Sequence, residues 1–331
     1  MMRHLVLALS VSSVLCLAIP QTGEAGAEEI VRVGVLKFGT VNWEIDTITN
    51  NGFDEKHGFR LEPVVLAGSD AGRIGINAGE IDVIVSDWLF VSRQRAEGIP
   101  LTFVPYSTSV GAIMVPDDSI AKTLADLRGS RVGVAGGPLD KNWLMYRAVA
   151  EDRYGFDLAE ETEPAYAAPP FLAEKLKDGE LAAASNFWHY NARLETEGYR
   201  ELLSGQDAAT ALGATGPISA IGYVFNEEWA AEHKDTMLGF VAASREAKEL
   251  LASSDAAWDK LRPSMNAEND AVFHNLVRRY REGIPSRPIA EEEADTKKIY
   301  LRLAAIGGEK LVGPATTLSP GTFWSALKDA Q

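Results

Sequence analysis

Short apolar runs alternate with longer amphipathic stretches along most of the chain. Each run is bounded by Gly, Asp or Pro, a pattern typical of buried strands in a parallel sheet. The runs predict strands at residues 31–36, 61–66, 81–85, 101–106, 131–135 and 181–187. Between them, helices are expected at residues 43–56, 71–78, 88–97, 142–154 and 171–177. This alternation predicts an α/β protein with parallel-rich sheets that carry helices on their faces.

Two further apolar segments, 111–115 and 219–225, are interpreted as a pair of crossing strands that join two lobes. They divide the chain into lobe one, made of residues 28–112 and 222–331, and lobe two, made of residues 113–221. The remaining C-terminal region shows apolar residues at helical spacing, which indicates helices that pack on the lobes. These helices are expected at residues 227–251, 267–281, 290–306 and 320–327.

Short sequence motifs that recur in the same order support an arrangement of two similar lobes. The tetrapeptide RVGV occurs at 32–35 and again at 131–134. A Gly-Glu pair followed by an apolar strand and a tryptophan, Trp88 in the first case and Trp188 in the second, also recurs in the same order. Repeated order at one spacing predicts that both lobes share one supersecondary arrangement.

The amino-acid composition limits the classes of partner that the chain can bind. The chain has 331 residues, with 32 Lys and Arg against 47 Asp and Glu, which gives a net charge of −15. Such an acidic balance without basic clusters excludes nucleic acid as a partner, because binding to phosphate backbones depends on clustered Lys and Arg. The length is ample for two lobes with buried cores, and we expect a monomer.

The N-terminus predicts export. A short basic start precedes an apolar stretch at 5–19, and small residues follow at 25–27, so residues 1–27 are predicted to be a cleavable signal peptide. A membrane anchor is the alternative, but the apolar stretch is shorter than the roughly 20 residues that span a bilayer. The only cysteine, Cys16, lies within this segment. The mature chain, periplasmic in this interpretation, would therefore have no disulfide, no cysteine-bound metal and no cysteine nucleophile.

Ligands of open parallel sheets bind beyond the carboxyl ends of the strands, where helices begin. Two lobes facing each other in this way can close on a small molecule about a hinge. The loops at these positions supply the candidate ligand-binding residues. They are Lys37, Thr40, Asn42, Trp43, Ser69, Asp70, Asp87, Trp88, Gly137, Asp140, Asn142, Asn186, Trp188, His189 and Pro217.

Several candidates also have a purely structural interpretation. Thr40, Ser69, Asp70, Asp87 and Asp140 are residue types that cap helices. Trp88 and Trp188 could sandwich a flat ligand, or either ring could belong to the core. Nucleophile elbows, phosphate-binding loops and zinc helices are absent from the sequence, so no catalytic residue, metal or cofactor is predicted and the chain is not expected to be an enzyme.

Five segments together resemble one family. They are VRVGVLKFG at 31–39, GFDEKHGF at 52–59, NAGEIDVIV at 77–85, TLADLRGSRVGV at 123–134 and KDGEL at 177–181. In their order they resemble the solute-binding proteins of nitrate/sulfonate/taurine-type ABC importers, whose relatives include binders of thiamine precursors. The resemblance implies a type-II periplasmic binding fold that captures a small solute and delivers it to a membrane permease powered by a separate ATPase.

The sequence departs from the family pattern at 185–189. Where relatives often have an acidic residue and then Trp-Glu-Pro, this chain has SNFWH, which would place Asn186 and His189 in the cleft. The ligand could be a sulfonate, taurine, nitrate, a thiamine precursor or a cationic or metal-complex solute. A periplasmic accessory or sensor is the alternative function, and an enzyme on the same fold is a further one.

Overall fold

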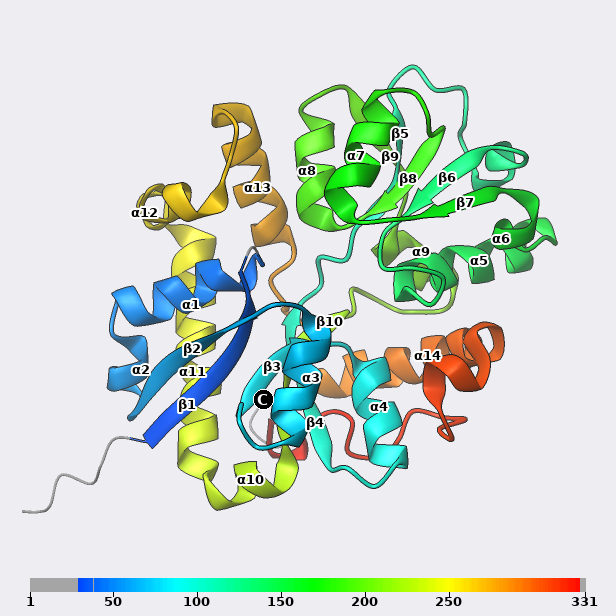
Figure 1. The fold of residues 1–331 in the computed structure, drawn as a ribbon. Coiled ribbons are helices and arrows are strands. Elements are labelled where there is room, and N and C mark those ends of the chain that lie inside the picture. The colour runs from blue at the N-terminus through cyan, green and yellow to red at the C-terminus, as the bar shows by residue number, and fades with distance from the viewer. Residues whose placement is uncertain (1–28, 38, 328–331) are drawn as a thin grey trace, which may run out of the picture.

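The computed structural model describes residues 29–37 and 39–327, so the predicted signal peptide and Cys16 lie outside the described residues. The chain forms two lobes, each built around one five-stranded sheet (Figure 1). The strand order is β2-β1-β3-β10-β4 in the first sheet and β7-β6-β8-β5-β9 in the second. This arrangement confirms the predicted α/β class.

The strands lie close to the predicted ranges. In the first sheet they are β1 (Glu29–Leu36), β2 (Phe59–Leu66), β3 (Val83–Ser86), β4 (Leu101–Ser107) and β10 (Ile221–Asn226). In the second sheet they are β5 (Ala112–Pro116), β6 (Arg131–Val134), β7 (Glu163–Tyr166), β8 (Ala183–Asn186) and β9 (Tyr199–Ser204). Within each sheet three neighbouring strands are parallel, and β10 or β5 is inserted as the antiparallel strand.

The recurring sequence motifs occupy equivalent positions in the two sheets. The two RVGV segments form β1 and β6, which occupy the second position of their sheets. Their glycines serve the same purpose, because a Cβ on Gly34 would lie 2.9 Å from Leu66 Cδ1 and a Cβ on Gly133 would lie 2.8 Å from Leu181 Cδ1. Each central strand therefore needs a residue without a side chain where its neighbours pack closely.

The chain crosses between the lobes just before the two segments predicted as crossing strands. The first crossing runs between β4 and β5, and the second runs from β9 through α9 (Gly205–Ala211) to β10. After each crossing the segment joins a single sheet as its antiparallel strand, with β5 between β8 and β9 and β10 between β3 and β4. The two crossings lie side by side at the waist of the molecule (Figure 1).

Helices cover the faces of both sheets. Those that follow strands of the first lobe are α1 (Val41–Asn50), α2 (Phe53–Lys56), α3 (Ser69–Asn77) and α4 (Trp88–Ala96). Those of the second lobe are α5 (Lys141–Tyr154), α6 (Leu158–Glu161), α7 (Pro169–Lys177) and α8 (Trp188–Glu195), besides α9 and the 3₁₀ turn at Leu124–Leu127. None of the helices within the described residues is long and apolar enough to span a membrane.

The C-terminal region contacts both lobes. It consists of α10 (Glu227–Glu232), α11 (Lys234–Ser253), α12 (Asp255–Met265), α13 (Asp270–Glu282) and α14 (Ile289–Val312). Helix α13 packs beside α8, and α14 packs beside α5 (Figure 1). Arg279 of α13 bonds to Glu195 and, at 2.6 Å, to Glu201, both in the second lobe. Arg302 of α14 reaches Asp152 of α5 at 2.5 Å.

Several predicted elements differ from the structure. The helix expected at 43–56 is split at Gly52, which has a φ of 65°, and the one expected at 227–251 is split at His233. The prediction of a helix at 320–327 was wrong, because only a short 3₁₀ turn at Ser325–Leu327 forms there. Strands β7 and β9 were missed because both lie at sheet edges and their exposed or half-buried residues lack a continuous apolar run.

A buried ion pair fixes α1 within the first lobe. Glu44 of α1 is fully buried and bonds to Lys248 of α11. Its carboxylate also accepts hydrogen bonds from Tyr223 of β10 at 2.7 Å, Ser244 at 2.6 Å and Tyr280 of α13 at 3.1 Å. The ammonium group of Lys248 lies 4.4 Å from the ring centre of Tyr106. One side chain thus ties the start of α1 to a strand and two C-terminal helices.

Removing one partner of this pair is expected to be costly. The substitution Lys248→Met leaves the Glu44 carboxylate buried without its counter-charge, which should lower the free energy of unfolding by about 3–5 kcal/mol. Lys260→Met, at an exposed position of α12, is the matched control and should change it by no more than about 0.5 kcal/mol. Urea unfolding of the three proteins measures the difference. Equal stability of both variants would contradict this role of the pair.

Candidate ligand-binding site

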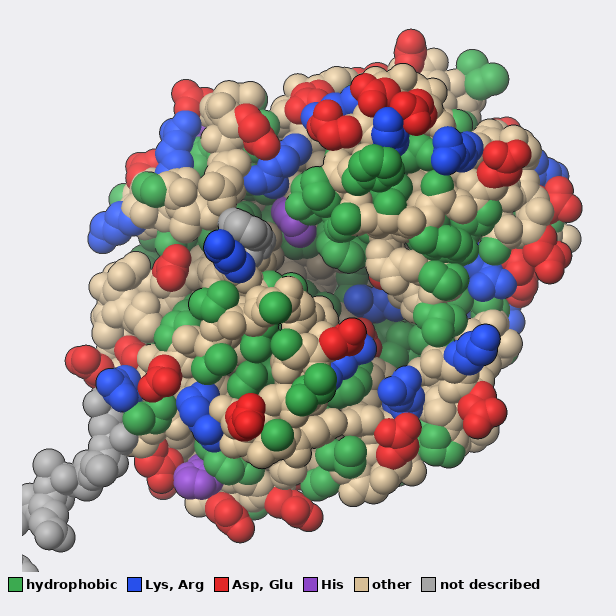
Figure 2. Space-filling model, in the orientation of Figure 1, with side chains coloured by type: hydrophobic (Ala, Val, Ile, Leu, Met, Phe, Trp, Pro, Cys, Tyr) green, Lys and Arg blue, Asp and Glu red, His purple; other side chains and the backbone are tan. Residues whose placement is uncertain are grey.

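The two lobes enclose a cavity of about 560 Å³, here called the interlobe cavity. It lies at the carboxyl ends of β1, β2, β3, β6 and β8, which is where parallel sheets bind ligands. Residues of both crossings, Ser109, Val110, Ala220 and Ile221, form part of its wall. Figure 2 shows the molecular surface hollowed between the lobes, with hydrophobic side chains gathered around the hollow.

Several predicted residues meet in this cavity. Six of the predicted residues line it: Thr40, Ser69, Asp87, Asp140, Trp188 and His189. A second, adjoining cavity of about 400 Å³, here called the side chamber, is lined by Lys37, Thr40, Asn42, Trp43 and His189 among others. Loops that are separated by more than a hundred residues in the sequence therefore converge on one region between the lobes.

Helix N-termini from both lobes point to the interlobe cavity. Two of these helices are capped by aspartates, because Asp87 Oδ1 accepts from the Phe90 N–H at 2.8 Å and Asp140 Oδ1 accepts from the Asn142 N–H at 2.9 Å. Helices α1, α3 and α8 begin there without a side-chain cap. In α1 the N–H groups of Asn42 and Trp43 already donate to the carbonyl groups of Gly39 and Thr40. The first backbone N–H groups of α3 and α8 have no partner within their own helix, so they can bind the oxygen atoms of an anionic or polar ligand.

Charged groups of both signs complete the wall. Arg73 of α3 lies 4.7 Å from the ring centre of Phe90, and its Nε atom is buried without a hydrogen-bond partner among the described residues. Across the cavity, burial raises the pKa of Asp140, and the nearby Asp87 carboxylate raises it further. The wall can therefore bind an acidic group through Arg73 and the helix N-termini and a hydrogen-bond donor through the two carboxylates.

His189 lies at the junction of the two cavities and lines both of them. Burial, with a smaller contribution from the Arg193 cation, lowers the pKa of His189 to about 3. Its Nδ1 atom is buried and has no hydrogen-bond partner among the described residues. The imidazole is therefore neutral near pH 7, and it offers hydrogen bonds rather than a charge.

A tryptophan pair joins the lobes beside this junction. Trp43 of α1 and Trp188 of α8 meet edge to face, with ring centres 5.9 Å apart. Trp43 is almost fully buried and also contacts Trp258 of α12 at 5.9 Å. Because one ring comes from each lobe, the contact exists only when the lobes are close together.

Other predicted residues lie away from the cavity. Trp88 is 1% exposed and packs against Tyr300 in the core, so Trp88 and Trp188 cannot form the predicted sandwich. Asp70 points into solvent with 93% of its side chain exposed. Asn142 and Asn186 are buried and donate hydrogen bonds to the carbonyl groups of Val110 and Pro169. Gly137 and the exposed Pro217 do not line either cavity.

Sequence reasoning missed several wall residues. Arg73 could have been found, because it lies one helical turn after Ser69 and therefore on the same face of α3. Lys310 and Leu311 come from α14, and no local pattern predicts that the end of this helix reaches the cavity. Tyr190 and Arg193 of α8 line the side chamber and follow His189 on the same helix. Among the residues that the structure describes, no three His, Cys, Asp or Glu side chains group as a metal site.

The fold and site define a two-lobed binding-protein architecture, and comparison with known proteins identifies the family. Residues 49–256 match the family model described as NMT1/THI5 like, so the chain belongs to this family. This confirms the family resemblance expected from the sequence. The chain has no significant sequence match among curated proteins.

Solved structures share the fold over nearly the whole chain. The periplasmic aliphatic sulphonate binding protein SsuA from Escherichia coli is 20% identical with a TM-score of 0.70, and the match covers 92% of this chain and 100% of that one. The alkanesulfonate-binding protein SsuA from Xanthomonas axonopodis pv. citri, bound to MOPS, is 18% identical with a TM-score of 0.67, covering 90% and 99%. The desulfurization enzyme DSZB is 14% identical with a TM-score of 0.59, covering 92% and 100%.

The neutral state of His189 predicts a specific pH dependence. In the unfolded chain a histidine binds a proton near pH 6.5, whereas folded His189 does so only near pH 3. His189 therefore makes the folded state less stable as the pH falls from about 6.5 towards 3, because only the unfolded chain gains the proton. In His189→Gln this contribution is absent, so the variant should lose less unfolding free energy than the wild type between about pH 7 and pH 4.5.

His274→Gln is the control, because His274 is exposed on α13. It should keep the wild-type pH dependence. Urea unfolding at both pH values tests the prediction, and a wild-type slope in His189→Gln would contradict it.

Proposed function

We propose that this chain is the periplasmic solute-binding component of an ABC importer. It would capture a small organic solute between its lobes and deliver it to a membrane permease driven by a separate ATPase. The observation that carries the proposal is a cavity of about 560 Å³ whose wall comes from both lobes and both crossings. Such a cavity opens when the lobes separate and closes when they meet, so solute binding and lobe closure are coupled.

The wall favours a solute with an acidic group. Uncapped N-termini of α3 from the first lobe and of α8 from the second would donate backbone hydrogen bonds to its oxygens. Arg73 adds a guanidinium group with a buried, unpaired Nε. Two of the structures with this fold are named as binding proteins for sulphonates or alkanesulfonates, which makes an organosulfonate the first solute to test.

The apolar part of the wall suits the body of an organic solute. Leu66, Phe90, Leu139, Phe187 and Trp188 line the cavity together with the polar groups. Binding sites for small organic molecules are mostly apolar with a few convergent polar groups. This balance favours an organic acid over a small inorganic anion such as nitrate.

The same wall supports binding without turnover. The Nδ1 atom of His189, the only histidine that lines the described cavity, is not oriented by a carboxylate. Asp87 and Asp140 each use one oxygen to cap a helix. A general base oriented by a third group, the arrangement that activates a nucleophile, is therefore not formed by these side chains. The desulfurization enzyme DSZB has a similar fold, and measurement of turnover distinguishes binding from catalysis.

Arg73 gives a direct test of the proposal. We expect ethanesulfonate to bind to the wild type, and Arg73→Met to weaken that binding at least tenfold, because a charge-assisted hydrogen bond contributes about 1.5–3 kcal/mol. Arg60→Met, on an exposed part of β2, is the control and should leave the affinity within twofold. Isothermal titration calorimetry measures all three. Absence of ethanesulfonate binding would reject the sulfonate class, and equal affinity in Arg73→Met would reject the proposed role of Arg73.

A further inference from the structure

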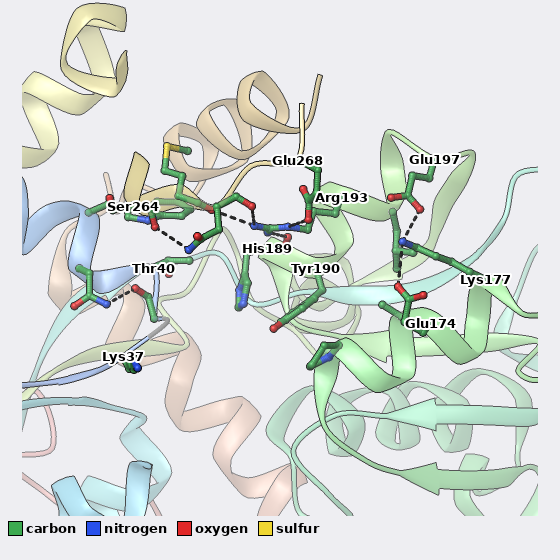
Figure 3. Close-up of a pocket in the computed structure, with 18 residues that line it drawn as sticks. Lys37, Thr40, Glu174, Lys177, His189, Tyr190, Arg193, Glu197, Ser264 and Glu268 are labelled. Atoms are coloured by element: carbon green, nitrogen blue, oxygen red, sulfur yellow. Dashed lines mark hydrogen bonds and ion pairs between the residues drawn. The ribbon is translucent and has the colours of Figure 1, made fainter. Parts of the chain in front are cut away.

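The side chamber continues the interlobe cavity on the far side of His189. It has a volume of about 400 Å³ and shares Gly39, Thr40 and His189 with the interlobe cavity. Its wall comes from the loop before α1, from α7 and α8 of the second lobe, and from the end of α12. Figure 3 shows His189 and Tyr190 extending from α8 into this space, opposite Thr40 and Lys37.

The charges of this wall are balanced within the protein. Three basic and three acidic side chains line the chamber. Lys177 pairs with Glu197 at 2.6 Å and with Glu174 at 3.4 Å, and Arg193 pairs with Glu268 at 3.1 Å. These ion pairs, visible as dashed lines in Figure 3, give each of the three carboxylates a cationic partner, with Lys177 shared between Glu174 and Glu197. A charged occupant would therefore find no unbalanced carboxylate to bind.

Uncharged hydrogen-bonding groups remain at the entrance to the chamber. The Tyr190 hydroxyl has no hydrogen-bond partner among the described residues. Its ring lies against the imidazole of His189, with ring centres 4.5 Å apart, so the two rings form one wall. The neutral imidazole has an Nδ1 atom that is also without a partner within the described chain. Tyr190 is half-buried, and its hydroxyl group can bond to an occupant of the chamber that carries hydrogen-bonding groups.

We propose that the side chamber receives a neutral, hydrogen-bonding extension of the solute whose acidic group is held in the interlobe cavity. The extension carries hydroxyl, ether or amide groups, passes Thr40 and His189, and bonds to Tyr190. The proposal rests on the proposed function and adds the chemical class of the second half of the solute. His189 and Tyr190 then determine specificity for long polar solutes over short ones.

Two probes with the same head group distinguish binding in the interlobe cavity alone from binding that extends into the side chamber. Ethanesulfonate fits the interlobe cavity alone, and the same sulfonate extended by a di(ethylene glycol) chain is long enough to enter the side chamber. Calorimetry on the wild type should show at least tenfold tighter binding of the extended probe. Tyr190→Phe removes only the hydroxyl and should reduce that advantage about threefold to tenfold, the effect of one hydrogen bond.

A variant that fills the side chamber tests whether the extension of the probe binds there. Ser264→Trp places a large ring at an exposed position of the chamber wall and should abolish the advantage of the extended probe while ethanesulfonate binding stays within twofold. Ser253→Trp, at the exposed end of α11 and outside both cavities, is the matched control and should keep the advantage.

The outcomes separate this proposal from the proposed function. Equal affinity of the wild type for both probes, or an equal loss for both in Ser264→Trp, would overturn the role of the side chamber and leave the proposed function standing. Failure of both probes to bind to the wild type would overturn the sulfonate-binding function and this proposal with it.

Discussion

The closed arrangement of the two lobes depends on contacts that the C-terminal helices make across the waist. Arg279 of α13 is shared between Glu195 and Glu201 of the second lobe. Although burial opposes ionisation of Glu195, hydrogen bonds from Arg279 and Asn275 lower its pKa, which favours the charged form of Glu195 beside Arg279. Burial raises the pKa of Glu201. These contacts hold α13 of the C-terminal region against the second lobe. The C-terminal helices, which the sequence predicts only as packing elements, therefore also connect the two lobes.

Glu44 and its four hydrogen-bond partners, here called the Glu44 cluster, connect the lobe contacts of α13 to the wall of the cavity. Glu44 bonds to Tyr280, which follows Arg279 on α13, and it lies next to Trp43, which touches Trp188 of the other lobe. The helix that begins at the cavity is thus fixed by the same α13 that contacts the second lobe. A buried charge is costly in energy unless it is fully hydrogen-bonded, and here four partners satisfy it. We infer that this cluster sets the position of α1 relative to both lobes.

The sequence predicted the fold better than the site. Strands such as β1 and β6 are buried apolar runs, so local patterns reveal them, whereas the edge strands β7 and β9 have no such pattern. Asp87 and Asp140 line the cavity, because they stand at helix starts that follow strand ends. Trp88 occupies the same place in its lobe as Trp188 in the other, yet tertiary packing against Tyr300 of α14 puts it in the core. Contacts from distant helices, such as that of Lys310, have no local signal at all.

The central claim is that the closed lobes hold one small solute and release it unchanged. Native mass spectrometry of the protein isolated from its source cells tests this most directly, because a solute held between the lobes adds its own mass to the folded chain. The account predicts a single low-mass adduct that leaves on unfolding with the same mass after prolonged incubation. A solute whose mass changes during incubation, or folded protein that never carries an adduct, would contradict it.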